Sequence, residues 1–321
     1  MHYDVFNGDA DGILSLIQLR KHAPKRSILI TGVKRDIKLL QKVAKEKNIS
    51  GVTILDISME KNLDALHELL DREIPIFYCD HHRTGEVPQG DNFTALINLD
   101  AQVCTSLLIN KHIGGRYVHW AIAGAFGDNL NAQAEALAQE CALQVEQTEF
   151  LKELGVLINY NGYGAELSDL HIEPAELFVQ LMQYESPFDL LEDTDSPYYL
   201  LKRGYESDAN NLEKLEASFT TISAEVYVLP SEAWARRISG VFGNELANKS
   251  PSKAHAVLTL NSSGEDYTVS VRAPLENRVG ADEVCSQFAT GGGRKAAAGI
   301  NQLPKSEVKN FVQALNQFYK N

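Results

Sequence analysis

The chain has 321 residues, of which 44% are hydrophobic and 23% charged, as is ordinary for a globular protein with a substantial core. Its net charge of −13 is uneven, because residues 1–205 carry 30 acidic and 18 basic side chains whereas residues 206–321 carry 13 and 12. Proteins that track long nucleic acid usually present a basic face, so this balance argues against long duplexes as partners. We expect any nucleic-acid substrate to be short or bound locally.

Membrane and secreted classes are also disfavoured. No apolar stretch approaches the ~20 residues of a membrane helix, and the N-terminus lacks a basic region followed by an apolar segment. We therefore expect a cytoplasmic location and no membrane partner. The four cysteines are scattered without a CxxC pair, which argues against a zinc knuckle or a disulfide scaffold.

The first half of the chain alternates short apolar runs with longer amphipathic runs. Such alternation predicts βαβ units and a parallel sheet that is buried on both faces. The expected strands are residues 3–7, 27–31, 52–55, 75–79 and 94–97, and the expected helices are residues 13–21, 37–47 and 62–70.

A mostly helical region is predicted from residue 104 to 201, with Ala-rich segments at 120–126 and 132–154. The polar stretch 192–197 carries turn signals and is predicted to be a hinge. A second α/β pattern follows, with strands at 225–229, 254–260 and 267–272 and helices at 232–246, 281–288 and 305–318. We predict an α/β protein of two domains. Residues 1–190 form a parallel-sheet domain with a helical extension, residues 191–215 a linker or connecting helix, and residues 216–321 a smaller α/β domain, with the active-site cleft between the domains.

Acidic and histidine side chains follow the predicted strands. Asp9 and Asp11 lie in Asn7-Gly8-Asp9-Ala10-Asp11-Gly12, Asp56 follows the strand at 52–55, Asp80-His81-His82 follows the strand at 75–79, and Asp128 lies in Gly127-Asp128-Asn129. In open α/β sheets, ligands bind outside the carboxyl ends of the strands, which is where these residues should meet. Carboxylates and imidazole suit Mn²⁺ or Mg²⁺, and two such ions can activate a water for in-line attack on phosphorus. The pattern indicates a metal-dependent hydrolase of phosphate esters.

Taken singly, each motif has a structural alternative. Asp-x-Asp-Gly is a common turn, Asp56 could be a helix N-cap, and a His pair is more often on the surface or in a satisfied core than on a metal. The joint occurrence of these motifs, in this order and at strand ends, favours the metal site.

A glycine-rich segment, Gly291-Gly292-Gly293-Arg294-Lys295, is the candidate for binding phosphate. Consecutive glycines let backbone N–H groups approach an anion closely, and Arg294 and Lys295 add charge there, with Arg272 expected on the same face. The alternative is a glycine turn with a solvated basic pair. Tyr160 and Tyr163 could stack on a base, although such tyrosines more often cap a helix junction.

These motifs resemble those of a known family. Phe6–Gly12, Asp56, Asp80-His81-His82 and Gly127-Asp128 match, in order, the four motifs of the DHH phosphoesterase superfamily. The segment from Gly291 to Gly299 resembles the GGGHxxAAG signature of the DHH-associated C-terminal domain, and Ser270-Val271-Arg272 is similar to its Ser-x-Arg strand. The resemblance implies a Mn²⁺-dependent phosphoesterase related to RecJ-type exonucleases and nano-RNases, with a catalytic N-terminal domain and a substrate-binding C-terminal domain.

The resemblance also implies roles for the individual residues. Asp9 would bind a first metal ion, Asp11, His81 and Asp128 a second, and Asp56 would bridge the two ions. Asp80 would orient His81, and His82 would face the scissile phosphate.

Two positions depart from the family pattern. Asn7 stands where members usually have His or Asp, and it can offer a metal ion only an uncharged carbonyl oxygen. The first ion is therefore expected to bind more weakly or to arrive with the substrate. Arg294 stands where the glycine motif normally carries His, which favours a terminal phosphate over stacking on a base.

The leading hypothesis is an enzyme that hydrolyses phosphodiester bonds of short oligonucleotides or dinucleotides with a water activated by two Mn²⁺ ions, Mg²⁺ being the alternative metal. A phosphatase of pyrophosphate, polyphosphate or small phosphorylated anions is the alternative enzyme. A nucleotide-binding regulatory module, weakened at Asn7, is the non-enzymatic alternative. A homodimer stays open, as do substrate length, sugar and polarity of attack.

Overall fold

The computed structural model of the protein describes residues 1–320. The chain divides into two compact units, Met1–Gly204 and the part that begins at Tyr205, and each is described here by itself. The division falls within helix α9 (Pro197–Ala209), inside the segment 191–215 that was predicted to connect two domains.

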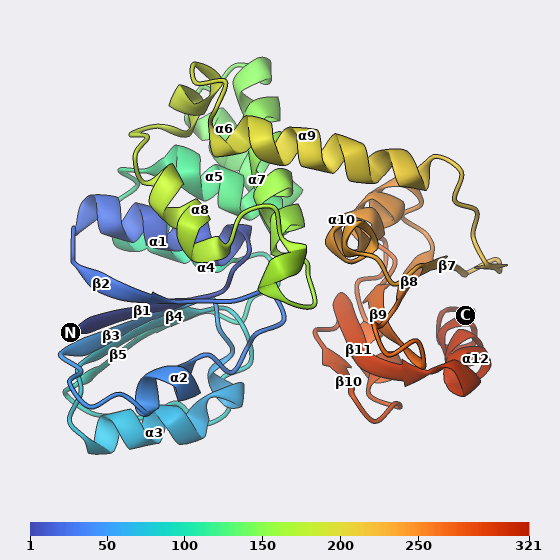
Figure 1. The fold of residues 1–321 in the computed structure, drawn as a ribbon, viewed down its shortest axis with the longest axis horizontal. Helices are drawn as coiled ribbons and strands as arrows, with labels where there is room; N and C mark the ends of the chain where they lie inside the picture. The colour runs from blue at the N-terminus through green and yellow to red at the C-terminus, as the bar shows by residue number, and fades with distance from the viewer. Residues whose placement is uncertain (321) are drawn as a thin grey trace. The chain divides into compact units, whose positions relative to one another are not determined.

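The first unit is built on a parallel sheet of five strands in the order β2-β1-β3-β4-β5 (Figure 1). The strands are β1 (His2–Phe6), β2 (Ser27–Ile30), β3 (Gly51–Leu55), β4 (Ile76–Asp80) and β5 (Phe93–Ile97). All five residues of the central strand β3 are buried, as expected for an apolar run with helices on both faces. The predicted α/β class and parallel sheet are confirmed.

Helices cover both faces of this sheet (Figure 1). One face carries α2 (Leu40–Ala44) and α3 (Leu63–Asp71), while α1 (Ala10–His22) lies on the other with the helical extension. The extension comprises α4 (Thr105–His112), α5 (Val118–Gly127), α6 (Asn131–Glu140), α7 (Val145–Gly162) and α8 (Pro174–Leu181), with short 3₁₀ turns between them. Strand order reverses between β1 and β3, and ligands of such sheets bind outside the carboxyl ends of the strands at this switch point.

One helix prediction of this unit was too long, and one segment predicted to be helical is interrupted. The helix expected at 37–47 spans only Leu40–Ala44. Its late start follows from the side chain of Asn62, which accepts from the Leu40 N–H (3.2 Å) and donates to the Ile37 carbonyl (2.6 Å). The helical segment expected at 132–154 is two helices, α6 and α7, because the backbone turns left-handed at Ala142 (φ 54°).

The second unit is a mixed sheet of six strands in the order β10-β11-β9-β8-β7-β6. Its strands are β6 (Phe219–Thr220), β7 (Ala224–Leu229), β8 (Ala254–Leu260), β9 (Asp266–Arg272), β10 (Gly291–Gly293) and β11 (Ala297–Pro304). Its helices are α10 (Ala233–Lys249), α11 (Ala281–Cys285) and α12 (Val308–Tyr319). Val269, Ile300 and Phe311 belong to its own buried core, so the predicted second, smaller α/β domain is confirmed.

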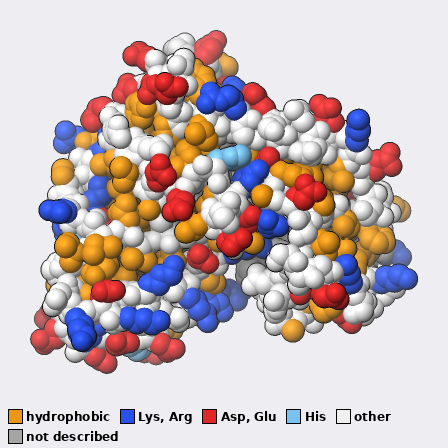
Figure 2. Space-filling view, viewed as in Figure 1, with side chains coloured by type: hydrophobic (Ala, Val, Ile, Leu, Met, Phe, Trp, Pro, Cys, Tyr) orange, Lys and Arg blue, Asp and Glu red, His pale blue; other side chains and the backbone are white. Residues whose placement is uncertain are grey.

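The surface carries charges of both signs, and the described helices lack the character of membrane spans. Figure 2 shows acidic and basic side chains interspersed over the visible face of each unit. Within residues 1–320, no helix combines the length and the apolar character that crossing a membrane requires.

Candidate metal centre

Asp9 and Asp11 are fixed at the start of helix α1, directly after β1. Asp9 is the N-cap, and its Oδ1 accepts from the Gly12 N–H at 3.1 Å. The two oxygens of Asp11 accept from the N–H groups of Thr105 (2.8 Å) and Ser106 (2.7 Å), which open helix α4. The Asp11 carboxylate therefore satisfies free donors of a second helix and is held rigidly in place.

The glycines of this loop serve close packing. A Cβ on Gly12 would lie 2.3 Å from the Asn7 carbonyl oxygen, and one on Gly8 would lie 1.8 Å from that of Gly32. Neither glycine has a positive φ, whereas Asp56, which follows β3, does (φ 59°). Left-handed backbone at a buried non-glycine residue is uncommon and is held here by the surrounding structure.

Asp56 is buried among like charges. Burial raises the pKa of its carboxyl well above the ordinary value, and the negative charges of Asp11, Asp9, Asp80 and Asp128 raise it further. One hydroxyl donor, Thr105 Oγ1, reaches its Oδ1 at 3.2 Å. A cluster of this kind is unfavourable unless a proton or a metal ion offsets its charge.

His81 lies close to three carboxylates of the cluster. Its Nδ1 donates to the Val103 carbonyl oxygen at 2.8 Å, which leaves Nε2 to face the carboxylates. This Nε2 lies 3.4 Å from Asp56 Oδ1, 3.7 Å from Asp11 Oδ2 and 3.9 Å from Asp128 Oδ2. Ligands of one octahedral ion with bonds of ~2.1 Å are separated by about 3.0 Å when adjacent and about 4.2 Å when opposite. The three distances from Nε2 fall within this range or close to it, so each of these oxygens is near enough to share an ion with His81.

Asp128 reaches this group from the end of helix α5. It is the residue that follows the helix, whose last residue is Gly127. A Cβ on Gly127 would lie 2.3 Å from that of Ala10, so glycine allows α5 to approach α1 closely enough to deliver Asp128.

Asp80 has a different partner from the one predicted. Its Oδ1 is 2.7 Å from Nδ1 of His82, whereas the ring of His81 is oriented by the Val103 carbonyl. Burial tends to raise the pKa of Asp80, but the charge and hydrogen bond of His82 hold it below its ordinary value. The prediction that Asp80 orients the His81 ring is wrong, and Asp80 instead orients the ring of His82 through its Nδ1.

The residues present fit a divalent ion. Asp80 Oδ2 and Asn7 Oδ1 are buried without a hydrogen-bond partner among the described residues. Asp56, His81 and His82 also offer ligand atoms within 4.8 Å of one another, although His82 Nδ1 is committed to Asp80. Mn²⁺ or Mg²⁺ would satisfy such unpartnered buried oxygens and offset the charge of the carboxylates. Carboxylate oxygen and imidazole nitrogen are ligands that these ions accept.

Lys34, which the sequence reasoning missed, lies in the same place. It follows the carboxyl end of β2, and its Nζ is 2.5 Å from Asp9 Oδ2 and 2.8 Å from Asn159 Oδ1. Burial opposes the charge of Lys34, but the Asp9 carboxylate raises its pKa above the ordinary value. The carboxylates were found by searching the residues that follow the predicted parallel strands. The same search for basic residues would also have found Lys34.

The glycine segment is an edge strand rather than a turn. Gly291–Gly293 form β10, and the turn is Arg294–Ala297, whose ends exchange backbone hydrogen bonds of 2.9 and 3.2 Å. Since Gly293 pairs with Ala298 in this register, its N–H points to the open edge of the sheet. Gly293 needs glycine for its φ of 147°, whereas a Cβ on Gly292 would meet no atom within 4 Å.

The basic residues of this unit differ in exposure. Arg272 donates to Asn244 Oδ1 (2.6 Å) and to the carbonyls of Val271 (3.2 Å) and Gly240 (3.3 Å), so much of its guanidinium is committed inside the unit. Arg294 and Lys295 are exposed on the turn.

Base stacking on Tyr160 is excluded by its burial. Tyr160 is fully buried, and its hydroxyl lies 2.7 Å from His171 Nε2. Tyr163 is also buried, and the Lys34 ammonium lies 5.1 Å from its ring centroid. These tyrosines therefore support the junction after helix α7, which was the structural alternative.

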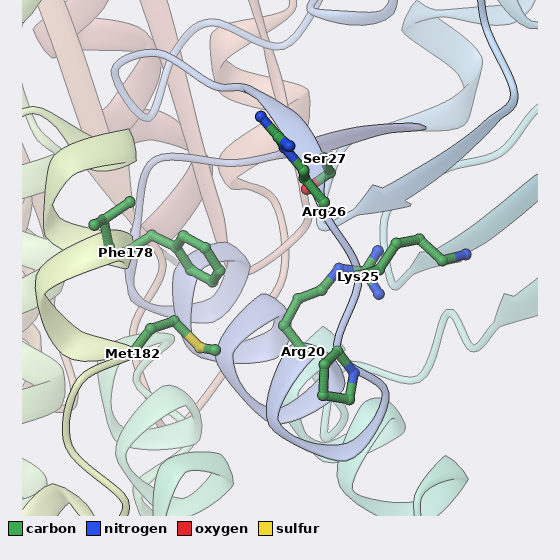
Figure 3. A pocket seen from close by; sticks show the side chains of 8 residues that line it. Arg20, Lys25, Arg26, Ser27, Phe178 and Met182 are labelled. Carbon is green, nitrogen blue, oxygen red and sulfur yellow. The ribbon is translucent and has the colours of Figure 1, made fainter. Parts of the chain in front are cut away.

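A pocket of about 450 Å³ lies elsewhere in the first unit (Figure 3). Phe178 and Met182 lie on one side of it, and Arg20, Lys25 and Arg26 on the other. It opens at the amino end of β2, whereas the candidate metal centre lies at the carboxyl ends of the strands. None of the predicted site residues lines it.

Comparison with known proteins agrees with this architecture. The family model of the DHHA1 domain matches residues 222–321. Among solved structures, a DHH-domain protein described as a member of a family of ribosomal proteins is 14% identical, with a TM-score of 0.66 over 99% of this chain and 86% of its own. Exonuclease RecJ bound to manganese is 15% identical, with a TM-score of 0.62 over 100% and 90%. The pGpG-specific phosphodiesterase PggH of Vibrio cholerae is 13% identical, with a TM-score of 0.56 over 100% and 99%. No curated protein matches the chain.

The protein thus has a two-unit α/β fold with carboxylates and histidines at the switch point of a parallel sheet. That fold is similar to those of a solved DHH-domain protein, RecJ and PggH, and the DHHA1 family model matches residues 222–321. The resemblance read from the four motifs is confirmed at the level of fold.

Proposed function

We propose that the protein is a Mn²⁺-dependent phosphoesterase that hydrolyses phosphodiester bonds of short oligonucleotides or dinucleotides. The observation that carries this proposal is the position of His81 Nε2, within 3.4–3.9 Å of carboxylate oxygens of Asp56, Asp11 and Asp128. Residues far apart in the sequence meet at metal-ligand spacing, at the crevice where such sheets bind ligands.

In this proposal, Asp11, Asp56, His81 and Asp128 hold one divalent ion, and Asp9, Asn7 and Asp56 form a second position beside it. Bound divalent ions supply an activated water and neutralise charge on the phosphate oxygens. Asp9 can bind a metal ion through Oδ2 only after Lys34 moves away, because the two side chains form an ion pair.

His82 is proposed to serve the leaving group. Its side chain is 28% exposed, unlike that of His81 at 2%, so it can meet a substrate. Since Asp80 accepts from His82 Nδ1, only Nε2 faces outward, and a proton held on Nε2 can pass to the departing oxygen.

The DHHA1 domain is proposed to bind the far end of the substrate. The outward N–H of Gly293, the open space beside Gly292 and the exposed Arg294 and Lys295 form a group suited to a terminal phosphate. The manganese bound to RecJ and the dinucleotide named for PggH support a Mn²⁺ enzyme of short nucleotide substrates. The net charge of −13 agrees with a short substrate.

A phosphatase of pyrophosphate, polyphosphate or small phosphorylated anions is the second candidate, favoured by the same Arg294 and Lys295 pair. Purified protein with Mn²⁺ is offered 5′-phosphorylated dinucleotides, longer RNA and DNA, cyclic dinucleotides, pyrophosphate and polyphosphate. Turnover of dinucleotides that is lost in Asp56→Ala supports the first proposal. Turnover of pyrophosphate or polyphosphate alone supports the second, and nucleotide binding without turnover of any substrate would identify a regulatory module instead.

A further inference from the structure

Lys34 stands where a metal ion is expected to meet Asp9. Its Nζ lies 2.5 Å from Asp9 Oδ2 and 2.8 Å from Asn159 Oδ1, with the Tyr163 ring on a third side at 5.1 Å. The other oxygen of Asp9 accepts from the Gly12 N–H. Both oxygens of a carboxylate proposed as a metal ligand are therefore already engaged, one of them by a full positive charge.

Lys34 is held in the site by contacts of its backbone and of its side chain. Its backbone N–H donates to the Gly162 carbonyl at 2.8 Å, and its own carbonyl accepts from Asn7 Nδ2 at 3.4 Å. Its side chain is only 23% exposed, and its partner Asn159 is 2% exposed. A lysine fixed at both backbone and ammonium differs from a flexible surface lysine that only visits a carboxylate.

The neighbouring residue Asn7 fits the same picture. Asn7 is uncharged and nearly buried, so it adds no negative charge beside Asp9 that a metal ion would have to neutralise. Its Oδ1 has no hydrogen-bond partner within residues 1–320, which suits it as a ligand for a cation that replaces the ammonium. By contrast, Asp11 and Asp56 face the imidazole of His81, at 3.7 and 3.4 Å from its Nε2, rather than a lysine ammonium.

We infer that the Lys34 ammonium is a built-in cation for Asp9, so that the protein binds one divalent metal ion tightly, at Asp11, Asp56, His81 and Asp128, and a second only by displacing Lys34. The inference rests on the metal centre of the proposed function. It adds that one metal position binds tightly and that the other is filled only when Lys34 is displaced. Lys34 would then determine how many metal ions the protein binds.

The test counts bound Mn²⁺ without measuring turnover, from the electron paramagnetic resonance signal of free Mn²⁺ during titration of the full-length protein. Wild type should show one tight site and a second at least about tenfold weaker, because the second ion competes with an ammonium. Lys34→Met should tighten the second site by about tenfold or more and give the spectrum of a spin-coupled Mn²⁺ pair. Lys34→Arg keeps the charge and should retain the wild-type pattern, as should Lys38→Met at an exposed lysine of the same loop.

Asn159→Ala removes the anchor of the Lys34 ammonium and should shift the second site in the same direction by a smaller factor, which provides a test if Lys34→Met fails to fold. Two equally tight sites in wild type would overturn the inference, as would an unchanged second site in Lys34→Met or, if that variant does not fold, in Asn159→Ala. Asp56→Asn serves to separate the two claims, since it should weaken the tight site. If it leaves that site intact, or if wild type binds no Mn²⁺ tightly, the metal centre of the proposed function is itself wrong.

Discussion

Nε2 of His81 lies 3.4 Å from Oδ1 of Asp56, and both side chains are 2% exposed. The pair joins the end of β4 to the end of β3, and each residue is held by a separate contact, with the Val103 carbonyl on His81 and the Thr105 hydroxyl on Asp56. A buried imidazole nitrogen and a buried carboxylate that face each other are stabilised when a cation binds between them.

Metal removal should therefore destabilise the wild type, and Asp56→Asn should remove that sensitivity. Asparagine tolerates the left-handed backbone at this position and carries no charge among Asp11, Asp9 and Asp80. With Mn²⁺ at about 100 times its Kd, we expect EDTA to lower the Tm of the wild type by about 5 °C or more. Thermal unfolding of both proteins with and without EDTA measures this, and an equal EDTA effect in Asp56→Asn would contradict the account.

Asp80→Asn tests which histidine Asp80 orients. Because Asp80 contacts the His82 ring, the variant should lower kcat while Mn²⁺ affinity stays within about threefold. Loss of a partner that orients a ligand histidine typically lowers metal affinity by about 10–100-fold. A drop of that size in Mn²⁺ binding would assign Asp80 to His81 after all. Asp100→Asn, at an exposed aspartate of the same unit, is the control.

Neighbouring glycines of β10 should respond in opposite ways to alanine. Gly293→Ala should destabilise the protein by about 1–3 kcal/mol, because its φ is 147° and its Cβ would lie 2.4 Å from Ala298 Cα. Gly292→Ala should leave stability within about 0.5 kcal/mol but raise KM for a 5′-phosphorylated substrate, because the space it fills is open in the protein. Urea unfolding and steady-state kinetics measure both effects, and an unchanged KM in Gly292→Ala would remove β10 from the phosphate site.

A buried ion pair should make the first unit sensitive to acid. Burial opposes the charge of Asp4, but hydrogen bonds from Arg20, His2 and Ser27 lower its pKa to about 2. A depressed pKa stabilises the folded state above the unfolded value of about 3.9, and this contribution is lost as pH falls from about 5 towards 2. Its size is on the order of 2 kcal/mol.

The measurement is urea unfolding of metal-free protein across that pH range. Asp4→Asn leaves the Arg20 charge buried without its partner, so it should be less stable than wild type at neutral pH. The gap between the two proteins should narrow by about 2 kcal/mol towards pH 2. A gap that stays constant with pH would show that Asp4 does not titrate with folding.

Much of the fold follows from local pattern. The five strands of the first sheet were predicted to within about two residues at each end, since a buried parallel strand is a continuous apolar run. What local pattern could not supply was the action of distant side chains, such as Asn62 on the backbone at Ile37 and Leu40, which shortened α2.

The same limit applies to the site. Rules for strand ends placed Asp9, Asp56 and His81 together, but they could not say which partner each ring nitrogen would take. Gly291–Gly293 were predicted as a phosphate-binding segment, with a turn as the alternative, and local pattern did not show that they form an edge strand.

The central claim is that this centre hydrolyses short phosphodiesters with the help of a divalent metal. Its most direct test is chromatographic detection of mononucleotide released from a 5′-phosphorylated dinucleotide by purified protein. The account predicts release with Mn²⁺, none with EDTA, recovery when Mn²⁺ is restored, and a loss of at least about 100-fold in Asp56→Asn. Release that persists in EDTA or in Asp56→Asn, or no release with Mn²⁺ present, would contradict it.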